Sequence, residues 1–431
     1  MSKNRKLLIV QCAALGKGLL DTHSVSSMAG LDVRTCKTMF PALTCTAQAT
    51  FRTGTLPASH GIIANGFFSR ELMRPIFWEQ SAALVTGKRL WHNLQRTGTK
   101  VGMFFWQQSL GEECDWIVSP APIHKHHGGM IQSLYSKPAD LGRKLNEHLG
   151  DFDLMHYWGP TASSKSSEWI AKATALAISL PDAPELFLTY LPALDYDLQR
   201  FGPGSNQAAK AIDSLTKQLY LLHEAAQKNG YELLIFGDYA IREVTGSAIL
   251  PNRCLNEAGL FATRAIKGMA YPDFHQSRAF ALVDHEIAHV YCLDGSSVEQ
   301  VRACLANVEG IDSIMDRNQQ TIAGLYHARS GDLLVTAKKG HWFAYPWWKN
   351  EREAPEYARH VDIHSKPGYD PCELFWGWPP FSVSRDTSRI KGTHGVIGDD
   401  GAIAWMTTIK DDIKAADICG LAKQAIEWIG Q

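Results

Sequence analysis

The sequence has little of three features that would narrow its class. Its 43 Lys and Arg residues face 44 Asp and Glu residues, so the formal net charge of the 431-residue chain is -1. Because affinity for a phosphate backbone comes mainly from Lys and Arg, this balance excludes a nucleic-acid polymer as a partner held by bulk positive charge. No apolar run approaches the roughly 18 residues of a membrane-spanning helix. Internal repeats and low-complexity tracts are also missing, and a small phosphate ester stays compatible with this composition.

Cysteine is present but unpatterned. The nine cysteines form no CxxC pair, and their number is odd. This usage is typical of a reducing compartment, in which most cysteines act as small buried residues. At the N-terminus, Arg5 and Lys6 precede the short apolar run Leu7–Val10, which imitates a leader segment. Because that run is too short for one, we interpret it as a first buried strand and expect a cytoplasmic protein.

Short apolar runs and a long amphipathic stretch predict the fold class. Between the runs, residues 206–228 carry apolar side chains at steps of three and four, which predicts a helix. Alternating strands and helices indicate an α/β fold with a mostly parallel central sheet and helices on both faces. In such sheets ligands bind at the carboxyl ends of the strands. The runs that predict buried strands are 6–12, 100–106, 185–191 and 232–236.

Residues 251–385 differ from the rest of the chain in their pattern of apolar and aromatic residues. We predict a smaller α+β lobe there, packed on a core formed by residues 1–250 and 386–431. This lobe is either a lid or a satellite hydrophobic cluster beneath long loops. Its expected elements are strands at 279–283, 288–293 and 333–337, a helix at 297–308, and aromatic clusters at 342–348 and 375–380.

The stretch from Pro41 to Gly66 is the part of the sequence richest in chemistry. It is polar, rich in hydroxyls, and lies between two segments that are predicted to be ordered. A hydroxyl nucleophile at the start of a helix would gain from the helix N-terminus, which stabilises an alkoxide and an anionic substrate. The plainer alternative is that Thr44 only caps the helix.

The order of residues in this stretch resembles that of a known family. Thr44, Gly54, His60-Gly61-Ile62 and Asn65 follow one another as in the type I phosphodiesterase / nucleotide pyrophosphatase family of the alkaline phosphatase superfamily, and Thr44 and Asn65 lie 21 positions apart, the family's spacing. Phosphonoacetate hydrolase is similar in its N-terminal half. The resemblance implies an alkaline phosphatase-like fold, with Thr44 as the nucleophile and Asn65 as an amide donor to a phosphoryl oxygen.

The same resemblance implies a metal centre that is only partly retained. The family binds two metal ions, usually zinc, through six ligands besides the threonine. Asp195, Asp238 and His394 match three of the six. Gln199 and Tyr239 stand where two histidines are expected.

The remaining departure is the pair Ala13-Ala14, which stands in place of an Asp-Gly pair. Alanine supplies no ligand, Gln199 is a weak neutral oxygen ligand, and Tyr239 is a phenol with an ordinary pKa of about 10. An oxygen-rich set with one nitrogen suits Mn²⁺ or Mg²⁺ better than Zn²⁺. We therefore expect one or two divalent ions (Zn, Mn or Mg), or none.

Other histidines could replace the lost ligands. His364, in a loop with Asp362, is the preferred candidate because loops carry function more often than strand interiors do. His285 and His289 would share one face of a strand. His124, His126 and His127 form a third group. For each of these, the alternative is a structural or solvent-facing histidine.

These observations favour a hydrolase of small phosphate or phosphonate esters that works through a phosphothreonine intermediate and a divalent metal. The aromatic clusters could stack a base or cover an apolar leaving group. The alternative is a catalytically degenerate member that binds a metabolite or anion without hydrolysis. A sulfatase relative fits poorly, since Cys45 lacks the Pro and Arg of that motif. The substrate-binding residues and the oligomeric state are left open.

Overall fold

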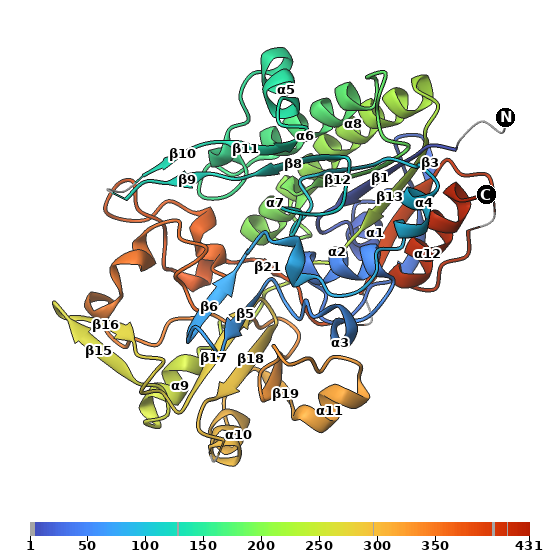
Figure 1. Ribbon diagram of the computed structural model, residues 1–431. Coiled ribbons are helices and arrows are strands. Elements are labelled where there is room, and N and C mark those ends of the chain that lie inside the picture. Colours follow the sequence, from blue (N-terminus) through green and yellow to red (C-terminus); the bar gives the residue numbers. More distant parts are fainter. Residues whose placement is uncertain (1–4, 127–128, 296, 399–400, 412) are drawn as a thin grey trace.

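A computed structural model describes residues 5–126, 129–295, 297–398, 401–411 and 413–431. Its largest sheet has eight strands in the order β11-β8-β7-β12-β1-β13-β22-β4 (Figure 1). The pairs from β8 to β13 are parallel, whereas β11, β22 and β4 join in antiparallel fashion. The strands are β1 (Leu7–Cys12), β4 (Arg34–Lys37), β7 (Val101–Phe104), β8 (Trp116–Pro120), β11 (Leu134–Lys137), β12 (Leu186–Leu191), β13 (Glu232–Gly237) and β22 (Ala402–Thr407).

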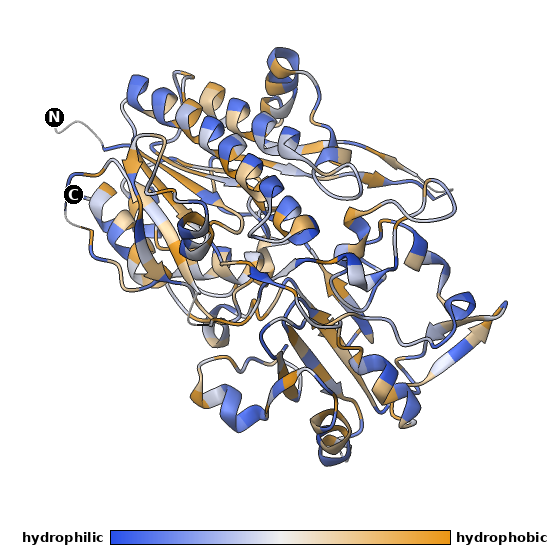
Figure 2. Cartoon of the chain, turned by 180° about the vertical axis from the view of Figure 1, so that it is seen from behind, coloured by the Kyte–Doolittle hydropathy of each residue, from blue (hydrophilic) through white to orange (hydrophobic). Residues whose placement is uncertain are grey.

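The central strands match the four apolar runs of the sequence. All six residues of β1 and all six of β12 are buried. Such strands contain continuous apolar runs because helices cover both faces of a parallel sheet. Figure 2 shows these strands in the colour of hydrophobic residues, whereas the helices carry both colours. The predicted fold class, an α/β fold with a mostly parallel central sheet, is therefore confirmed.

The helices lie on both faces of this sheet (Figure 1). The longest, α8 (Asn206–Lys228), has the predicted bounds, and the Ser205 hydroxyl caps it by accepting a hydrogen bond from the Ala208 N–H. It packs against α6 (Ser164–Ala177) and α7 (Ala193–Phe201), whereas α2 (Thr44–Thr53) packs against α12 (Ile418–Ile429). Shorter helices are α1 (Lys17–Thr22), α3 (Pro57–His60), α4 (His92–Arg96) and α5 (Leu141–Leu149).

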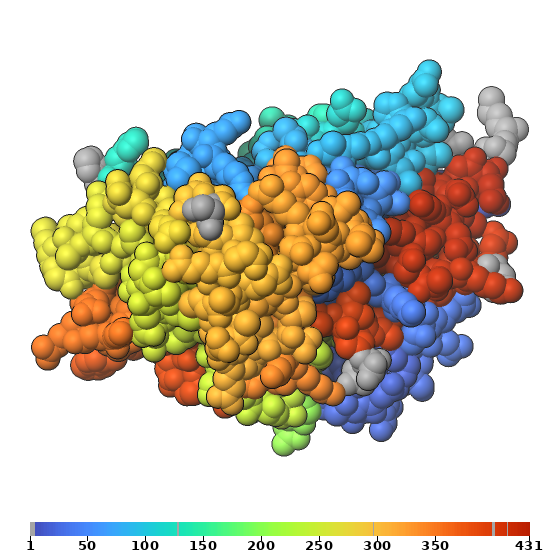
Figure 3. Space-filling view, turned by 90° about the horizontal axis from the view of Figure 1, so that it is seen from below, coloured from blue at the N-terminus to red at the C-terminus, as the bar shows by residue number. Residues whose placement is uncertain are grey.

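A second, antiparallel sheet has the strand order β17-β18-β20-β19. Its residues form a separate hydrophobic cluster, which Phe68 and Phe77 from the first part of the chain also join. Seen from below, the yellow and orange segments that carry this sheet form one contiguous mass (Figure 3). Its elements are β17 (Ala279–Asp284), β18 (Ile287–Cys292), β19 (Ile311–Met315), β20 (Leu333–Ala337), α9 (Pro251–Glu257), α10 (Val298–Ala306) and α11 (Arg317–Ile322).

The remaining strands form short two-stranded ribbons. Phe68 and Phe77, which join the second cluster, come from one of them. The ribbons are β2 (Ser27–Met28) with β3 (Leu31–Asp32), β5 (Gly66–Ser69) with β6 (Arg74–Phe77), β9 (Ile123–His124) with β10 (Met130–Ile131), β14 (Arg242–Glu243) with β21 (Gly392–Thr393), and β15 (Thr263–Ile266) with β16 (Met269–Pro272).

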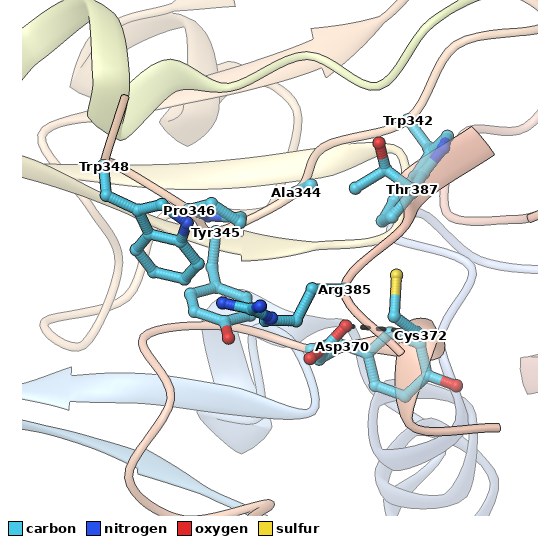
Figure 4. A pocket seen from close by; sticks show the side chains of 10 residues that line it. Trp342, Ala344, Tyr345, Pro346, Trp348, Asp370, Cys372, Arg385 and Thr387 are labelled. Carbon is cyan, nitrogen blue, oxygen red and sulfur yellow. Dashed lines mark hydrogen bonds between the residues drawn. The ribbon is translucent and has the colours of Figure 1, made fainter. Parts of the chain in front are cut away.

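The aromatic clusters of the sequence have two different environments. Trp342, Trp347 and Trp348 are buried, and the Trp347 ring packs edge-on against Phe261 at 5.4 Å, so these side chains are core rather than a stacking platform. A small pocket is lined by Tyr345 of this segment together with Asp370 and Arg385 (Figure 4). By contrast, Trp378 is 82% exposed and Phe381 is 89% exposed. Within the described part of the chain, no helix combines the length and apolarity needed to cross a membrane.

Candidate active site

Thr44 is the first residue of α2, and it is buried. The residue at the N-cap position is Leu43, whose backbone is extended, so Thr44 lies inside the first turn and is not the cap. Its hydroxyl oxygen lies 3.4 Å from the phenol oxygen of Tyr190, a residue near the carboxyl end of β12. The first turn of a helix presents backbone N–H groups without intrahelical partners. The hydroxyl therefore sits beside a set of donors suited to an anion.

Asn65 forms a hydrogen bond with the first turn of α2. Its Oδ1 accepts a hydrogen bond from the Cys45 N–H at 3.1 Å. Its backbone N–H and its Nδ2 donate to the two carboxylate oxygens of Asp284, at 2.8 Å and 3.2 Å. Asp284 is the last residue of β17, so this chain of hydrogen bonds joins α2 to the second sheet. The sequence did not single out Asp284, although the neighbouring His285 was considered.

Asp195, on α7, is surrounded by donors from the chain itself. Its Oδ1 accepts from the Tyr239 phenol at 3.0 Å, and its Oδ2 accepts from the Gln199 amide. The Nε2 atom of His394 lies 4.0 Å from Oδ1. Burial raises the pKa of Asp195 to about 7, and the hydrogen bonds from Gln199 and Tyr239 oppose that rise.

Asp238 follows β13, and both of its carboxylate oxygens, like those of Asp195, accept hydrogen bonds from the chain. Its Oδ1 accepts from the backbone N–H groups of Ala14 and Tyr239, at 2.9 Å and 3.0 Å, and its Oδ2 accepts from the Gln11 amide at 3.0 Å. Burial raises the pKa of Asp238 to about 7. Ala14 has a φ of 60°, a left-handed conformation that favours glycine. The chain thus has a glycine-like, left-handed backbone at the position that the resemblance matches to the family's glycine, although alanines stand in place of the Asp-Gly pair.

Four aromatic rings form a continuous column beside these carboxylates. Tyr239 stacks on His394 with centroids 3.5 Å apart, and His285 stacks on Tyr369 at 3.9 Å. Between these pairs, the His394 and His285 rings lie 3.7 Å apart with planes tilted by 39°. The Tyr369 hydroxyl also donates to the Gln199 side-chain oxygen at 3.0 Å. His285 enters the column because it lies in the turn between β17 and β18, with a φ of 57°. It is therefore not on the strand face that it was expected to share with His289.

The donor set does not fit the two-metal centre that the resemblance implies. Among the residues that the structure describes, no group of three or more His, Cys, Asp or Glu side chains has an arrangement that could hold a metal ion. The Asp195 and Asp238 oxygens already accept hydrogen bonds from the chain. The Gln199 oxygen, a possible ligand, accepts from Tyr369. We therefore derive no chemical step through a metal ion.

The candidate replacement ligands lie in other surroundings. His364 is exposed, its Nδ1 lies 3.1 Å from the Phe77 carbonyl oxygen, and its ring meets that of His124 at 6.1 Å. His289 is buried, with Nε2 3.4 Å from the Ile63 carbonyl oxygen. His126 is exposed, and His127 lies outside the described residues. The structure thus brings Asp195, Asp238 and His394 together without these histidines, whereas His285, another candidate, packs against His394.

Tyr190, His285 and Tyr369 belong to the centre; the sequence offered His285 as a replacement metal ligand but did not mark the two tyrosines. Tyr190 and Tyr369 carry no motif. His285 is recognisable only in a short acid and histidine cluster. Burial lowers the pKa of His285 to about 3, so its imidazole is neutral near neutral pH. Its Nδ1 faces the Asp284 carboxylate at 2.8 Å, and its Nε2 is buried without a hydrogen-bond partner.

The large, mostly parallel sheet covered by helices gives the chain an alkaline phosphatase-like fold. The model of the type I phosphodiesterase / nucleotide pyrophosphatase family matches residues 17–370, and the chain belongs to that family. The resemblance seen in the sequence is thereby confirmed.

Individual relatives are distant. The venom phosphodiesterase CdcPDE of Crotalus durissus collilineatus is 23% identical over 224 residues, which are 50% of this chain and 23% of that protein. The chain thus spans about a quarter of the length of the curated relatives it matches.

Two solved structures share the fold over nearly the whole chain. Phosphonoacetate hydrolase from Sinorhizobium meliloti, in complex with phosphonoformate, is 12% identical with a TM-score of 0.64, and the match covers 99% of this chain and 96% of that one. Murine ectonucleotide pyrophosphatase / phosphodiesterase 5 is 13% identical with a TM-score of 0.61, over 99% and 95% of the two chains.

Proposed function

We propose that this chain is a hydrolase of small phosphate or phosphonate esters and that Thr44 is its nucleophile. The observation that carries the proposal is the position of Thr44 in the first turn of α2, beside an Asn65 side chain fixed by Asp284. Family membership supports the reaction class. The solved relatives hold phosphonoformate, phosphonoacetate and, in an inactive variant of the murine protein, AMP, which supports a small ligand of this chemistry.

The chemistry follows from the helix start. The Thr44 oxygen attacks phosphorus, the new phosphorus–oxygen bond forms, and the bond to the leaving oxygen breaks, with the hydroxyl proton passing to the leaving group. The N-terminal N–H groups of α2 and the free Nδ2 proton of Asn65 stabilise the charge on the phosphoryl oxygens. Water then attacks the phosphothreonine and restores the hydroxyl.

One observation favours a second candidate, binding of an anion without hydrolysis. The carboxylates that would hold activating ions, Asp195 and Asp238, accept hydrogen bonds from the chain on both of their oxygens. The helix start could still bind a phosphonate or phosphate group, since that needs only its N–H donors.

We further propose that the protein works in a reducing, cytoplasmic setting. All nine cysteines are free, and six of them are buried. This pattern supports the proposal because buried thiols that form no disulfides need no oxidising compartment.

The test compares two threonines of α2. Bis-p-nitrophenyl phosphate and p-nitrophenyl phenylphosphonate, a phosphonate ester, are offered to the chain, to Thr44→Ala and to Thr46→Ala, a matched control because the Thr46 hydroxyl is buried and without a partner. We expect Thr44→Ala to lose turnover by on the order of 1,000-fold or more, whereas Thr46→Ala keeps it. Equal turnover in the parent and Thr44→Ala would overturn the nucleophile. Absence of turnover together with a thermal shift by phosphonoformate would favour the binding candidate.

A further inference from the structure

We propose that the centre beside Thr44 is metal-independent. Asp195 and Asp238 have become hydrogen-bond acceptors for the chain's own donors, and a column of aromatic rings fills the centre in place of two metal ions. The inference concerns which groups the centre binds, and it does not depend on whether the chain hydrolyses a substrate. It rests on three features of the described residues.

The first feature is that Tyr239 replaces an expected metal ligand and also donates a hydrogen bond to Asp195, another expected ligand. Tyr239 stands at a position where the family has a histidine, and its phenol donates to Asp195 at 3.0 Å. The phenol oxygen is thus turned toward the carboxylate as a hydrogen-bond donor. Gln199 repeats the pattern, since its amide nitrogen also donates to Asp195. Both oxygens of this carboxylate are thus held by residues that replaced ligands.

The second feature is the rigid environment of Asp238. Two of its three donors are backbone N–H groups, from Ala14 and Tyr239. A side-chain donor can rotate away to admit an ion, but these two can leave only if the backbone after β1 or β13 moves. Replacing them by a cation would leave buried N–H groups without partners, which is unfavourable.

The third feature is the space that the rings fill. Tyr239 and His394 are in van der Waals contact, with planes 4° apart, and His285 packs on the other side of His394. The Nδ1 of His394 faces the Ala42 carbonyl oxygen at 2.7 Å, which leaves Nε2 as the single acceptor of that ring. Zinc needs ligands at about 2.0–2.3 Å and a set of four, and one imidazole nitrogen does not supply that set.

The experiment measures metal content, not activity. The full-length chain is purified without a polyhistidine tag, dialysed with and without EDTA, and analysed for Zn, Mn and Mg by mass spectrometry. We expect less than about 0.1 ion per chain and no thermal shift when each metal is added, since an ion that binds only the folded state would raise the melting temperature. One ion per chain that resists dialysis and is lost in Asp195→Asn would overturn the inference.

A restored ligand set provides the second arm. The variant Ala13→Asp/Gln199→His/Tyr239→His is expected to gain at least one tightly held Zn²⁺ per chain and to melt higher with the metal than without. The matched control, Gln199→Ala/Tyr239→Phe, removes the same two donors to Asp195 and adds no ligand, and it should gain none. Equal metal uptake by both variants would show that the lost histidines are not the cause.

Folding of the restored variant is followed by circular dichroism, and Tyr239→His alone serves where the triple variant does not fold. Folded protein of either kind that takes up no metal would also overturn the inference. Because metal content and turnover are separate readouts, an inactive, metal-free parent would count against the proposed hydrolysis and leave this inference standing. A metal-loaded, active parent would support the proposed hydrolysis and overturn this inference.

Discussion

The ring of Tyr239 lies flat on the imidazole of His394, with centroids 3.5 Å apart and planes 4° apart. The same Tyr239 side chain donates a hydrogen bond to Asp195, and its backbone N–H donates one to Asp238. One residue therefore contacts Asp195, Asp238 and His394, the three residues that the sequence resemblance matched to metal ligands of the family. Tyr239 is thus part of the packing of the centre on several sides at once.

Asp284 should matter for both stability and ligand binding. Its carboxylate faces three donors: the Asn65 N–H, the Asn65 amide and Nδ1 of His285. In Asp284→Asn an amide NH₂ would face one of these donors. We expect a loss of roughly 1–3 kcal/mol in the free energy of unfolding in urea, and weaker phosphonate binding. Asp312→Asn, an exposed site on β19, is the control, and equal effects at both sites would contradict the prediction.

The buried ion pair of α2 should be costly to break. Arg52, at the end of α2, is fully buried, and its Nη1 lies 3.2 Å from the Glu112 carboxylate. Glu112→Gln would leave the Arg52 charge without its partner. We expect a loss of about 3–5 kcal/mol, measured by urea denaturation. The neighbouring Glu113 is exposed, so Glu113→Gln should leave stability within about 0.5 kcal/mol of the parent.

Acid should weaken the fold through His60. Burial lowers the pKa of this imidazole from 6.5 to about 3, so between these values the unfolded chain binds a proton that the folded chain does not. Stability from this group is therefore lost as the pH falls from about 6.5 toward 3.

The measurement is the difference in unfolding free energy between the parent and His60→Gln at two pH values. Gln can replace the contacts of the ring with the Thr50 hydroxyl and the Ile62 N–H. We expect this difference to change by about 1.4 kcal/mol between pH 5 and pH 4, in favour of the variant. The exposed His148→Gln should show no such change, and a parallel pH profile for His60→Gln would refute the assignment.

Two cysteines on neighbouring helices should form a disulfide under oxidation. The Sγ atoms of Cys254, on α9, and Cys304, on α10, are 2.6 Å apart. Burial raises the pKa of Cys254 to about 12, so the reactive thiolate is scarce at neutral pH and a chemical oxidant is needed to take up the two electrons and two protons. Closing this loop, with the cysteines 50 positions apart, should stabilise the chain by at most roughly 4 kcal/mol.

The check is peptide mapping by mass spectrometry after treatment with copper phenanthroline, with Cys254→Ser as the control. Linkage of the two peptides in the parent but not in the variant is the expected result. Two free thiols after exhaustive oxidation would contradict it.

The sequence predicted the elements whose pattern is local. Residues 206–228 form α8 because their apolar side chains recur at helical spacing over many turns, and β1 is recognisable as a continuous apolar run. The order of Thr44 and Asn65 likewise predicted a shared site, and Asn65 bonds the residue after Thr44.

The ring column was not predictable in the same way. Its members, Tyr239, His285, Tyr369 and His394, come from four segments far apart in the chain, and their stacking depends on how the two sheets dock. The preference for loop residues favoured His364, which the structure places in an exposed position near Phe77. No local pattern distinguishes a histidine in a tight turn inside the centre from one in an outer loop.

The hydrogen bonds between Asn65 and Asp284 join residues that are 219 positions apart. Contacts of such long range require the loop between them to close before they contribute any stabilisation. The start of α2 therefore gains this support only when β17 has docked beside it. A phosphonate probe that binds there would report on the docking of the second sheet against α2.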